Sequence, residues 1–200
     1  MLRGYLAYAQ QPPMWQLTDE DGLPSMEVYD AFQDRKGYMW FGTDLGVCRY
    51  DGSKFKRYAT PTARSKAMSN FAEDRDGQVW FMNFSRQVFY IDKATDQVKE
   101  LKIDVGPKQG RLMGYFINKS SNKVYVFISS SIYQYDITKK KWQDANLKVS
   151  KTSAIWTMAQ DPEGNIWYVD ANRTIWTHGA DGVAKKRAQL DKKKFLGVDG

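Results

Sequence analysis

The stretch QDRKGYMWFGTDLGVCRYDGSKFKRY, residues 33–58, decides the fold because parts of it recur along the chain. The segment FQDRKGYMWF at 32–41 returns as AEDRDGQVWF at 72–81 and AQDPEGNIWY at 159–168, with a weaker copy, INKSSNKVYV, at 117–126. The aromatic markers of the four copies are Trp40, Trp80, Tyr125 and Trp167, at spacings of 40, 45 and 42 residues. Such a period is typical of repeat architectures, so the stretch is one structural unit among several.

A second marker follows each aromatic residue, as CRYDG at 48–52, FYID at 89–92, YQYD at 133–136 and, degraded, IWTHGADG at 175–182. The unit is strand-forming throughout. In the first copy we expect strands at 28–32, 38–41, 47–50 and 55–58, separated by turns at 34–37 and 42–46 and by a two-residue hairpin at Asp51-Gly52. Helices should be few, because no segment combines a 3.6-residue period with capping signals.

Four short antiparallel strands in about 40 residues, with a recurring Trp, are typical of a β-propeller blade. The fold class is therefore predicted as all-β, with blades at about 22–60, 66–103, 110–147 and 152–189. We interpret the marker aromatic residues as packing between blades, with ligand stacking as the alternative. The structural repeat markers are Asp34, Gly37, Trp40, Asp51, Gly52, Asp74, Gly77, Trp80, Tyr125, Asp161, Gly164 and Trp167.

The net charge of +7 raises the question of a polyanionic partner. Much of this charge lies in two lysine-rich patches, at 138–142 and 184–194. We interpret both patches as solvated turns or strand edges, where lysine discourages edge-to-edge pairing. No nucleic-acid-binding pattern accompanies the charge, so no nucleic-acid partner is predicted.

Few residues offer metal or redox chemistry. Cys48 is the only cysteine and is expected to be a small buried hydrophobe, and His178 is the only histidine, which excludes a histidine-based metal triad. The DRDG sequence at 74–77 resembles half of a calcium loop, but nothing after Gly77 supplies the remaining oxygen ligands, so a plain hairpin turn is predicted. No metal, cofactor or catalytic residue is predicted.

The N-terminus, MLRGYLAYAQQ, has a basic Arg3 and an Ala7-Tyr8-Ala9 pattern suited to signal peptidase. Its apolar run is too short for a working signal peptide. Residues 1–13 are therefore interpreted as the remnant of a signal peptide and leader, with an ordinary N-terminal segment as the alternative. No stretch is long and apolar enough to span a membrane.

Residues 22–58, GLPSMEVYDAFQDRKGYMWFGTDLGVCRYDGSKFKRY, closely resemble the repeat of the two-component regulator propeller family. The second and fourth copies keep the Asp, Gly and Trp but lose Gly-Thr, and the resemblance extends over about residues 14–182. The matching residues of the first copy are Gly22, Leu23, Ser25, Gln33, Asp34, Gly37, Trp40, Gly42, Thr43, Gly46, Arg49, Tyr50, Asp51, Gly52, Phe55 and Tyr58.

This resemblance implies a periplasmic sensor region of a hybrid two-component histidine kinase anchored in the inner membrane. Such regions commonly detect oligosaccharides and control polysaccharide-utilisation genes. The implied partners are an oligosaccharide or other small ligand, further blades and the kinase region of the parent protein, and a homodimer is an open option. No ligand-binding residue is identified, and the chain shows no phospho-accepting His motif or ATP-binding glycine box.

Family propellers usually have seven blades, so residues 14–200 are expected to be part of a larger propeller. Residues 194–200, KFLGVDG, would open a fifth blade, and residues 14–18 would be a ring-closing strand. A closed four-bladed ring is the alternative.

Two other functions remain open. One is a scaffold for protein interaction or dimerisation, and the other is a propeller lyase or glycosidase. Glycoside hydrolysis needs two carboxylates about 5–10 Å apart in one pocket. The prominent Asp34, Asp74 and Asp161 are repeated turn residues, which argues against a unique active site.

Overall fold

The computed structural model describes residues 14–105, 112–128, 131–145, 155–179 and 183–191. These residues form sixteen strands and no helix, which confirms the all-β prediction, and so nothing in this part of the chain is a membrane-spanning helix. The strands are β1 (Val28–Gln33), β2 (Met39–Thr43), β3 (Gly46–Tyr50), β4 (Phe55–Tyr58), β5 (Met68–Glu73), β6 (Val79–Asn83), β7 (Val88–Asp92), β8 (Gln97–Glu100), β9 (Leu112–Asn118), β10 (Lys123–Ile128), β11 (Ser131–Asp136), β12 (Lys141–Asp144), β13 (Ile155–Gln160), β14 (Ile166–Asp170), β15 (Thr174–His178) and β16 (Ala184–Gln189).

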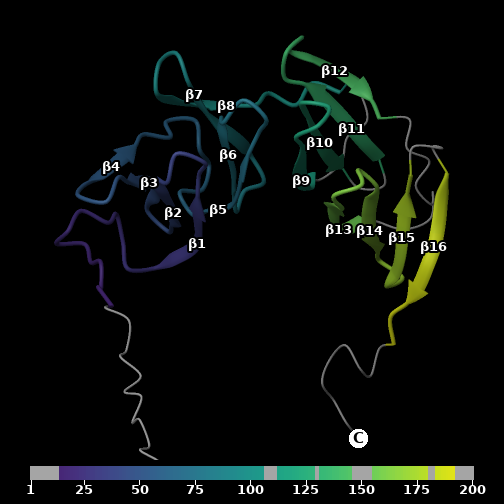
Figure 1. Cartoon of the computed structure of the whole chain (residues 1–200), viewed down its shortest axis with the longest axis horizontal. Helices are drawn as coiled ribbons and strands as arrows, with labels where there is room; N and C mark the ends of the chain where they lie inside the picture. The colour runs from purple at the N-terminus through teal and green to yellow at the C-terminus, as the bar shows by residue number, and fades with distance from the viewer. Residues whose placement is uncertain (1–13, 106–111, 129–130, 146–154, 180–182, 192–200) are drawn as a thin grey trace, which may run out of the picture.

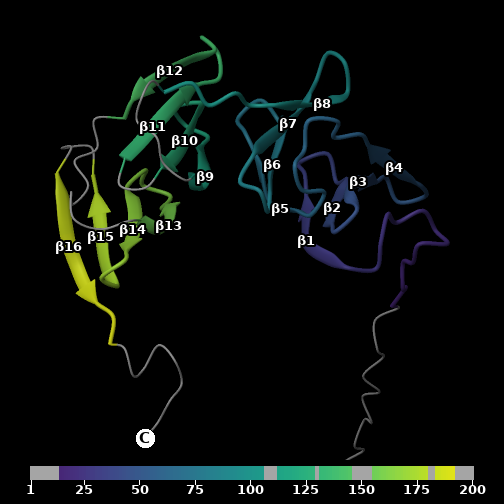
Figure 2. The same cartoon turned by 180° about the vertical axis from the view of Figure 1, so that it is seen from behind.

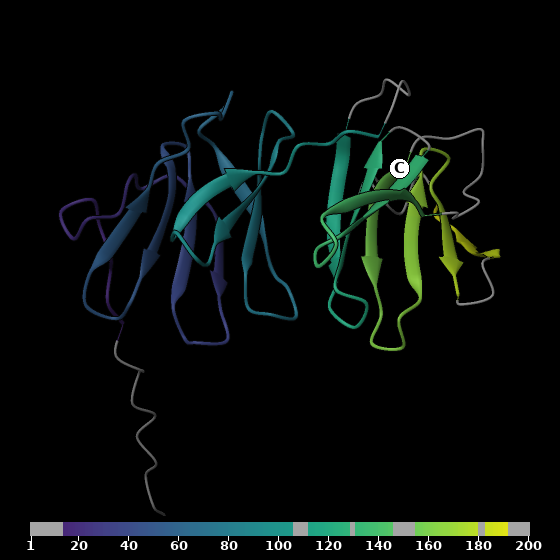
Figure 3. The same cartoon turned by 90° about the horizontal axis from the view of Figure 1, so that it is seen from above.

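The strands form four separate four-stranded antiparallel sheets, each made of four consecutive strands in chain order. The sheets follow one another along an arc, with β1, β5, β9 and β13 on the inside and β4, β8, β12 and β16 on the outside (Figure 1). Figure 2 shows the same arc from behind, and in Figure 3 the strands lie side by side with their connections at the two ends. This is the blade arrangement of a β-propeller, as predicted.

Each sheet lies within one of the residue ranges expected for a blade. Residues 14–18 lie outside every strand, so their ring-closing role stays a prediction, as do the domain boundaries. The signal-peptide remnant at 1–13 and the start of a fifth blade at 194–200 lie outside the described residues.

The core consists of three apolar clusters, one between each pair of neighbouring sheets. Trp40 packs with Phe81 and Phe89 of the second sheet, Trp80 with Val124 and Val126 of the third, and Tyr125 with Ile155 and Tyr168 of the fourth. A sheet cannot cover both of its faces alone, and these large aromatic side chains fill the space between two sheets. The predicted packing role therefore holds for the first three markers.

Trp167 differs from the other markers in exposure within the described structure, and its packing role between blades stays a prediction. Its side chain is 37% exposed, whereas Trp40 and Trp80 are 2% and 1% exposed. The physical reason is its position. Trp40, Trp80 and Tyr125 each pack against the sheet that follows in the chain, and the structure describes no sheet after β13–β16. Only the guanidinium of Arg187, 5.9 Å from the ring centroid, lies over the indole among the described side chains.

The turn before each marker Trp is fixed by an aspartate whose carboxylate accepts three hydrogen bonds. In the first copy, Asp34 Oδ1 accepts the backbone N–H groups of Lys36 and Tyr38, while Oδ2 accepts Trp40 Nε1–H at 2.8 Å. Asp74 makes the same three bonds in the second copy, to Asp76, Gln78 and Trp80. The glycine of the turn has a positive φ, +86° at Gly37 and +78° at Gly77, which L side chains adopt only with strain.

The same carboxylate–indole bond occurs once more, at a place that the sequence analysis missed. Asp170 Oδ2 accepts Trp176 Nε1–H at 3.0 Å in the fourth sheet, and Asp170 Oδ1 accepts the N–H groups of Asn172 and Thr174. The sequence signal was available, because Trp176 follows Asp170 by six residues, the same spacing as Asp34 to Trp40.

Two turns differ from their predictions. The loop after Tyr50 has four residues, 51–54, because β3 ends at Tyr50 and β4 begins at Phe55, so the predicted two-residue hairpin at Asp51-Gly52 is wrong. Of the Asp51-Gly52 dipeptide only Gly52 has a positive φ. The Asp51 side chain accepts three hydrogen bonds, two from Ser53 and one from Lys54. The predicted turn at 42–46 is a loop of only two residues, because Thr43 pairs with Gly46.

The loop aspartates give a prediction about acid stability. Hydrogen bonds, led by the Lys54 N–H, lower the pKa of Asp51 to about 2, and bonds led by the Lys99 side chain lower that of Asp92 to about 2. A carboxyl group whose pKa is lower in the folded state stabilises the fold at pH values above its ordinary pKa of 3.8. This contribution to stability is lost as the pH falls toward 2. We expect the melting temperature to fall over this window and to fall less in an Asp51→Asn/Asp92→Asn variant. An equal fall in both proteins would contradict this assignment.

Cys48 is fully buried in β3, as predicted for a small hydrophobe. Burial raises the pKa of its thiol to about 12, so the thiol stays protonated at pH 8. We expect a disulfide reagent to leave the native protein unmodified at pH 8 and to modify one thiol per chain in denaturant. Rapid modification of the native protein would contradict the burial of Cys48 in β3.

Candidate functional site

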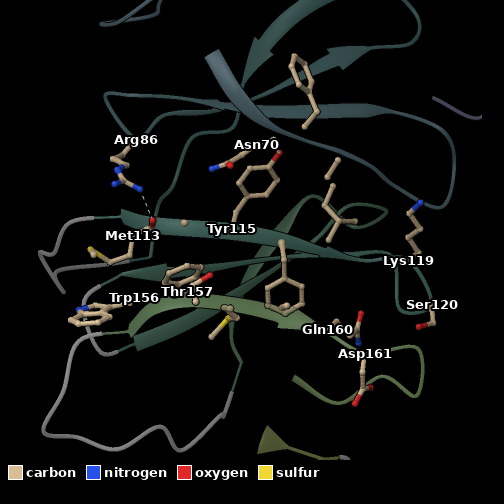
Figure 4. Close-up of a pocket in the computed structure, with 18 of the residues that line it drawn as sticks. Asn70, Arg86, Met113, Tyr115, Lys119, Ser120, Trp156, Thr157, Gln160 and Asp161 are labelled. Atoms are coloured by element: carbon tan, nitrogen blue, oxygen red, sulfur yellow. Dashed lines mark hydrogen bonds between the residues drawn. The ribbon is translucent and has the colours of Figure 1, made fainter. Parts of the chain in front are cut away.

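A groove with a volume of about 840 Å³ lies over the inner strands β5, β9 and β13. Figure 4 shows Arg86, Met113 and Trp156 at one end, with Lys119, Gln160 and Asp161 at the other. The two ends correspond to the two faces of the propeller, so the groove follows the inside of the arc. Central sites of this kind are common in propellers and barrels, where neighbouring elements converge.

Bulges in the inner strands shape this groove. The pairing register shifts between Ser69 and Ala72 in β5, opposite Phe127 and Ile128 in β9, and between Ile155 and Thr157 in β13. The residues placed in the three bulges include Asn70, Met113 and Trp156, all of which line the groove. A bulge re-aims a side chain that regular alternation would direct elsewhere, and bulges are frequent beside binding sites.

Asn70 and Tyr115 lie in the middle of the groove (Figure 4). The Tyr115 hydroxyl donates to the Asn70 carbonyl at 2.5 Å, which links the second sheet to the third. Asn70 has a φ of +57°, a left-handed conformation that is uncommon for a residue other than glycine. Desolvation, with a smaller effect of the Asp30 carboxylate, raises the pKa of Tyr115 well above its ordinary value, so the hydroxyl remains a donor at neutral pH.

One end of the groove is aromatic and cationic. Trp156 is 46% exposed, and a large exposed apolar side chain beside a cavity is available to a ligand. Arg86 Nη1 donates to the Met113 carbonyl at 2.6 Å, and Arg86 itself has a positive φ of +64°. This bond fixes the guanidinium at the edge of the groove while other N–H groups of Arg86 remain available.

The opposite end is polar. Asp161 Oδ2 accepts Trp167 Nε1–H at 2.8 Å and Asn165 Nδ2–H at 2.9 Å, and these bonds, with Trp167 first, keep the Asp161 pKa below its ordinary value. Gln160 donates to the Gly164 carbonyl at 3.0 Å. Lys119 completes this end from the turn between β9 and β10. The groove therefore offers aromatic surface together with amide, hydroxyl and charged groups.

A close contact inside the third sheet involves two residues that line the groove, Gly114 and Phe127. A Cβ on Gly114 would lie 2.5 Å from the Phe127 ring, so only glycine leaves room for that ring beside residue 114 of β9. Phe127 in turn lines the groove from β10.

The structure keeps the repeat markers of different units apart. In the first, second and fourth units an Asp, a Gly and a Trp lie at one turn, whereas Tyr125 is the single marker of the third unit. The markers of the four units do not converge on a common site. Of all the markers only Asp161 lines the groove. His178 is buried in β15 and does not line it. No group of three potential metal ligands occurs within the part of the chain that the structure describes.

Sequence reasoning did not identify the groove residues. Trp156 was the accessible signal, because it is a tryptophan outside the positions that recur from unit to unit. The bulge that exposes it depends on the pairing register of β13 with β14, which the alternation of residues 155–160 does not reveal.

The fold and this inner groove place the protein among β-propeller proteins, and the comparisons with known proteins agree. Residues 22–44 match the two component regulator propeller family model, which confirms the resemblance over this stretch. A comparison with curated proteins finds no match.

Two similar solved structures come from B. thetaiotaomicron. The extracellular domain of the proposed hybrid two component system BT3049 has a TM-score of 0.66 at 15% identity, covering 87% of this chain and 26% of that one. The corresponding domain of the proposed one component system BT4673 has a TM-score of 0.64 at 12% identity, covering 92% and 24%. The chain thus spans about a quarter of the length of these extracellular domains.

Virginiamycin B lyase from Staphylococcus aureus is also similar, with a TM-score of 0.63 at 14% identity, covering 83% of this chain and 57% of the lyase. At such identities the likeness is one of fold.

Proposed function

We propose that the chain is the N-terminal, periplasmic ligand-sensing propeller of a two-component sensor histidine kinase. The match at residues 22–44 and the fold shared with extracellular domains of two-component systems support this proposal. The parent protein would supply further blades, a membrane anchor and the kinase, and occupancy of the propeller would shift the state of the kinase.

The groove over β5, β9 and β13 is our candidate for the ligand site, and an oligosaccharide is our candidate for the ligand. The observation that carries this assignment is Trp156, whose ring is 46% exposed beside the 840 Å³ groove. Sugar rings have apolar faces that pack on aromatic rings and a rim of hydroxyls that need hydrogen-bond partners. Arg86, Asn70 and Gln160 provide such partners along the groove.

A matched pair of tryptophan variants tests the groove. We expect members of an oligosaccharide panel to raise the melting temperature of the chain and to bind saturably in calorimetry. Trp156→Ala should weaken this binding at least about tenfold, because it removes the exposed aromatic face. Trp15→Ala is the control, since Trp15 is also exposed, at 86%, and does not line the groove. Equal binding by both variants would contradict the groove assignment, and a panel without any effect would contradict oligosaccharide sensing by this propeller.

We further propose that this region is not catalytic. Asp161 is the only carboxylate among the described lining residues, and both of its oxygens accept hydrogen bonds. Glycoside hydrolysis by the usual route requires two carboxylates flanking the bond. Turnover of a glycan or of a streptogramin substrate by the purified chain would contradict this proposal.

A further inference from the structure

A second cavity, of about 270 Å³, lies between the first and second sheets. Three cationic side chains line it: Lys36 from the turn between β1 and β2, Arg49 from β3, and Lys93 from the loop between β7 and β8. In the described part of the chain these three side chains form no hydrogen bond and no ion pair. The three cations outnumber the two aspartates of the lining, so the cavity carries a net positive charge that favours an anion.

Arg49 is held in place without using its donors. Its guanidinium carbon lies 4.4 Å from the centroid of the Tyr38 ring and 5.7 Å from that of Trp40. The Nε atom is buried and has no hydrogen-bond partner among the described residues. A guanidinium has five N–H donors, and a buried donor without an acceptor is destabilising. The stacking thus orients a set of donors that a ligand can satisfy.

Two aspartates also line the cavity, but their oxygens already have partners. Asp34 Oδ1 accepts two backbone N–H groups of its own turn, and Oδ2 accepts Trp40 Nε1–H at 2.8 Å. Asp96 Oδ1 accepts the Tyr58 hydroxyl at 3.0 Å, and its Oδ2 pairs with Lys56. Neither carboxylate is hydrogen-bonded to Arg49, which leaves the guanidinium available.

We propose that this cavity is an anion-binding site for a carboxylate, sulfate or phosphate group on a ligand no larger than one sugar ring. Arginine binds such groups through two parallel N–H···O bonds, and the two lysines add charge without imposing a geometry. The small volume excludes a large ligand. Because the cavity lies between two blades, an anion bound there would also link the first sheet to the second. The site is distinct from the inner groove and does not depend on the function proposed for it.

Calorimetry on the complete chain tests this proposal, with sulfate, phosphate, glucuronate and neutral glucose as probes at constant ionic strength in chloride. We expect saturable binding of at least one anion and none of glucose. Binding of sulfate or phosphate would assign the site to free oxyanions, whereas binding of glucuronate alone would assign it to an acidic sugar. Failure of every anion to bind, or equal binding of glucose, would overturn the proposal.

Two variants locate the binding. Arg49→Met keeps most of the apolar stem and removes the charge, and it should weaken the anion at least about tenfold. Lys93→Met, in an exposed loop, should weaken it about threefold and keeps the test valid if the Arg49 variant does not fold. Lys139→Met is the control, because Lys139 is an exposed lysine in the turn between β11 and β12 and does not line the cavity. Loss of binding in the control to the same extent would show nonspecific attraction and would overturn the site.

Discussion

Trp80→Ala is expected to lower the free energy of unfolding by about 3–5 kcal/mol, while Trp167→Ala should lower it by about 1 kcal/mol or less. The two residues occupy equivalent positions in their repeat units, and each indole donates to an aspartate six residues earlier. The difference is burial, at 1% exposed for Trp80 and 37% for Trp167. The pair therefore measures how much packing between sheets contributes at a fixed position of the repeat.

Two effects add in the Trp80 variant. The cluster between the second and third sheets loses its largest side chain, leaving a cavity that Val124 and Val126 cannot fill. Asp74, which is 1% exposed, loses its indole donor and keeps a buried oxygen without that partner.

Urea unfolding followed by circular dichroism would measure both variants, since the signal does not depend on the tryptophan that is removed. Similar losses of stability in the two variants would mean that Trp167 is also covered by packing. That result would contradict the exposed position of Trp167 in the fourth sheet.

The second large effect is expected for Gly42→Ala, at about 3 kcal/mol. A Cβ built on Gly42 would lie 2.2 Å from the backbone oxygen and 2.8 Å from the carbonyl carbon of Met68. These atoms belong to the inner strand of the next sheet, so the first two sheets would have to separate. Backbone atoms of a paired strand cannot rotate away as a side chain can.

Gly114→Ala provides a matched comparison. Its new Cβ would lie 2.5 Å from the ring of Phe127, which is a side chain. We expect Phe127→Leu to recover part of the stability lost in Gly114→Ala, whereas Met68→Ala should recover none of the loss in Gly42→Ala. Thermal unfolding of the single and double variants would test this through the coupling energies. Rescue of Gly42→Ala by Met68→Ala would contradict a clash with the backbone.

The repeat itself shows why so much of the fold was predictable from the sequence. In the first, second and fourth units the Asp, Gly and Trp act within seven consecutive residues, through bonds such as those that Asp34 accepts from its own turn and from Trp40. Interactions this local leave a spacing in the sequence that can be recognised directly. The same spacing at Asp170 and Trp176 could have been found in this way.

The candidate site was less accessible, because it depends on contacts between units. The groove brings together residues of β5, β9 and β13 that span more than 80 positions of the chain, and Asn70 and Tyr115 meet through one hydrogen bond between sheets. The stacking of Arg49 on Tyr38 also depends on the register of β2 with β3.

By itself the sequence determined the all-β fold, the four units and their order, because turn chemistry and side-chain alternation act over a few residues. Only the tertiary structure decided that Trp167 is exposed while Trp80 is buried, and that bulges direct Asn70, Met113 and Trp156 into one groove. The physical reason is that burial and side-chain direction depend on the neighbouring sheet. Residues with the same local sequence pattern therefore differ according to what packs against them.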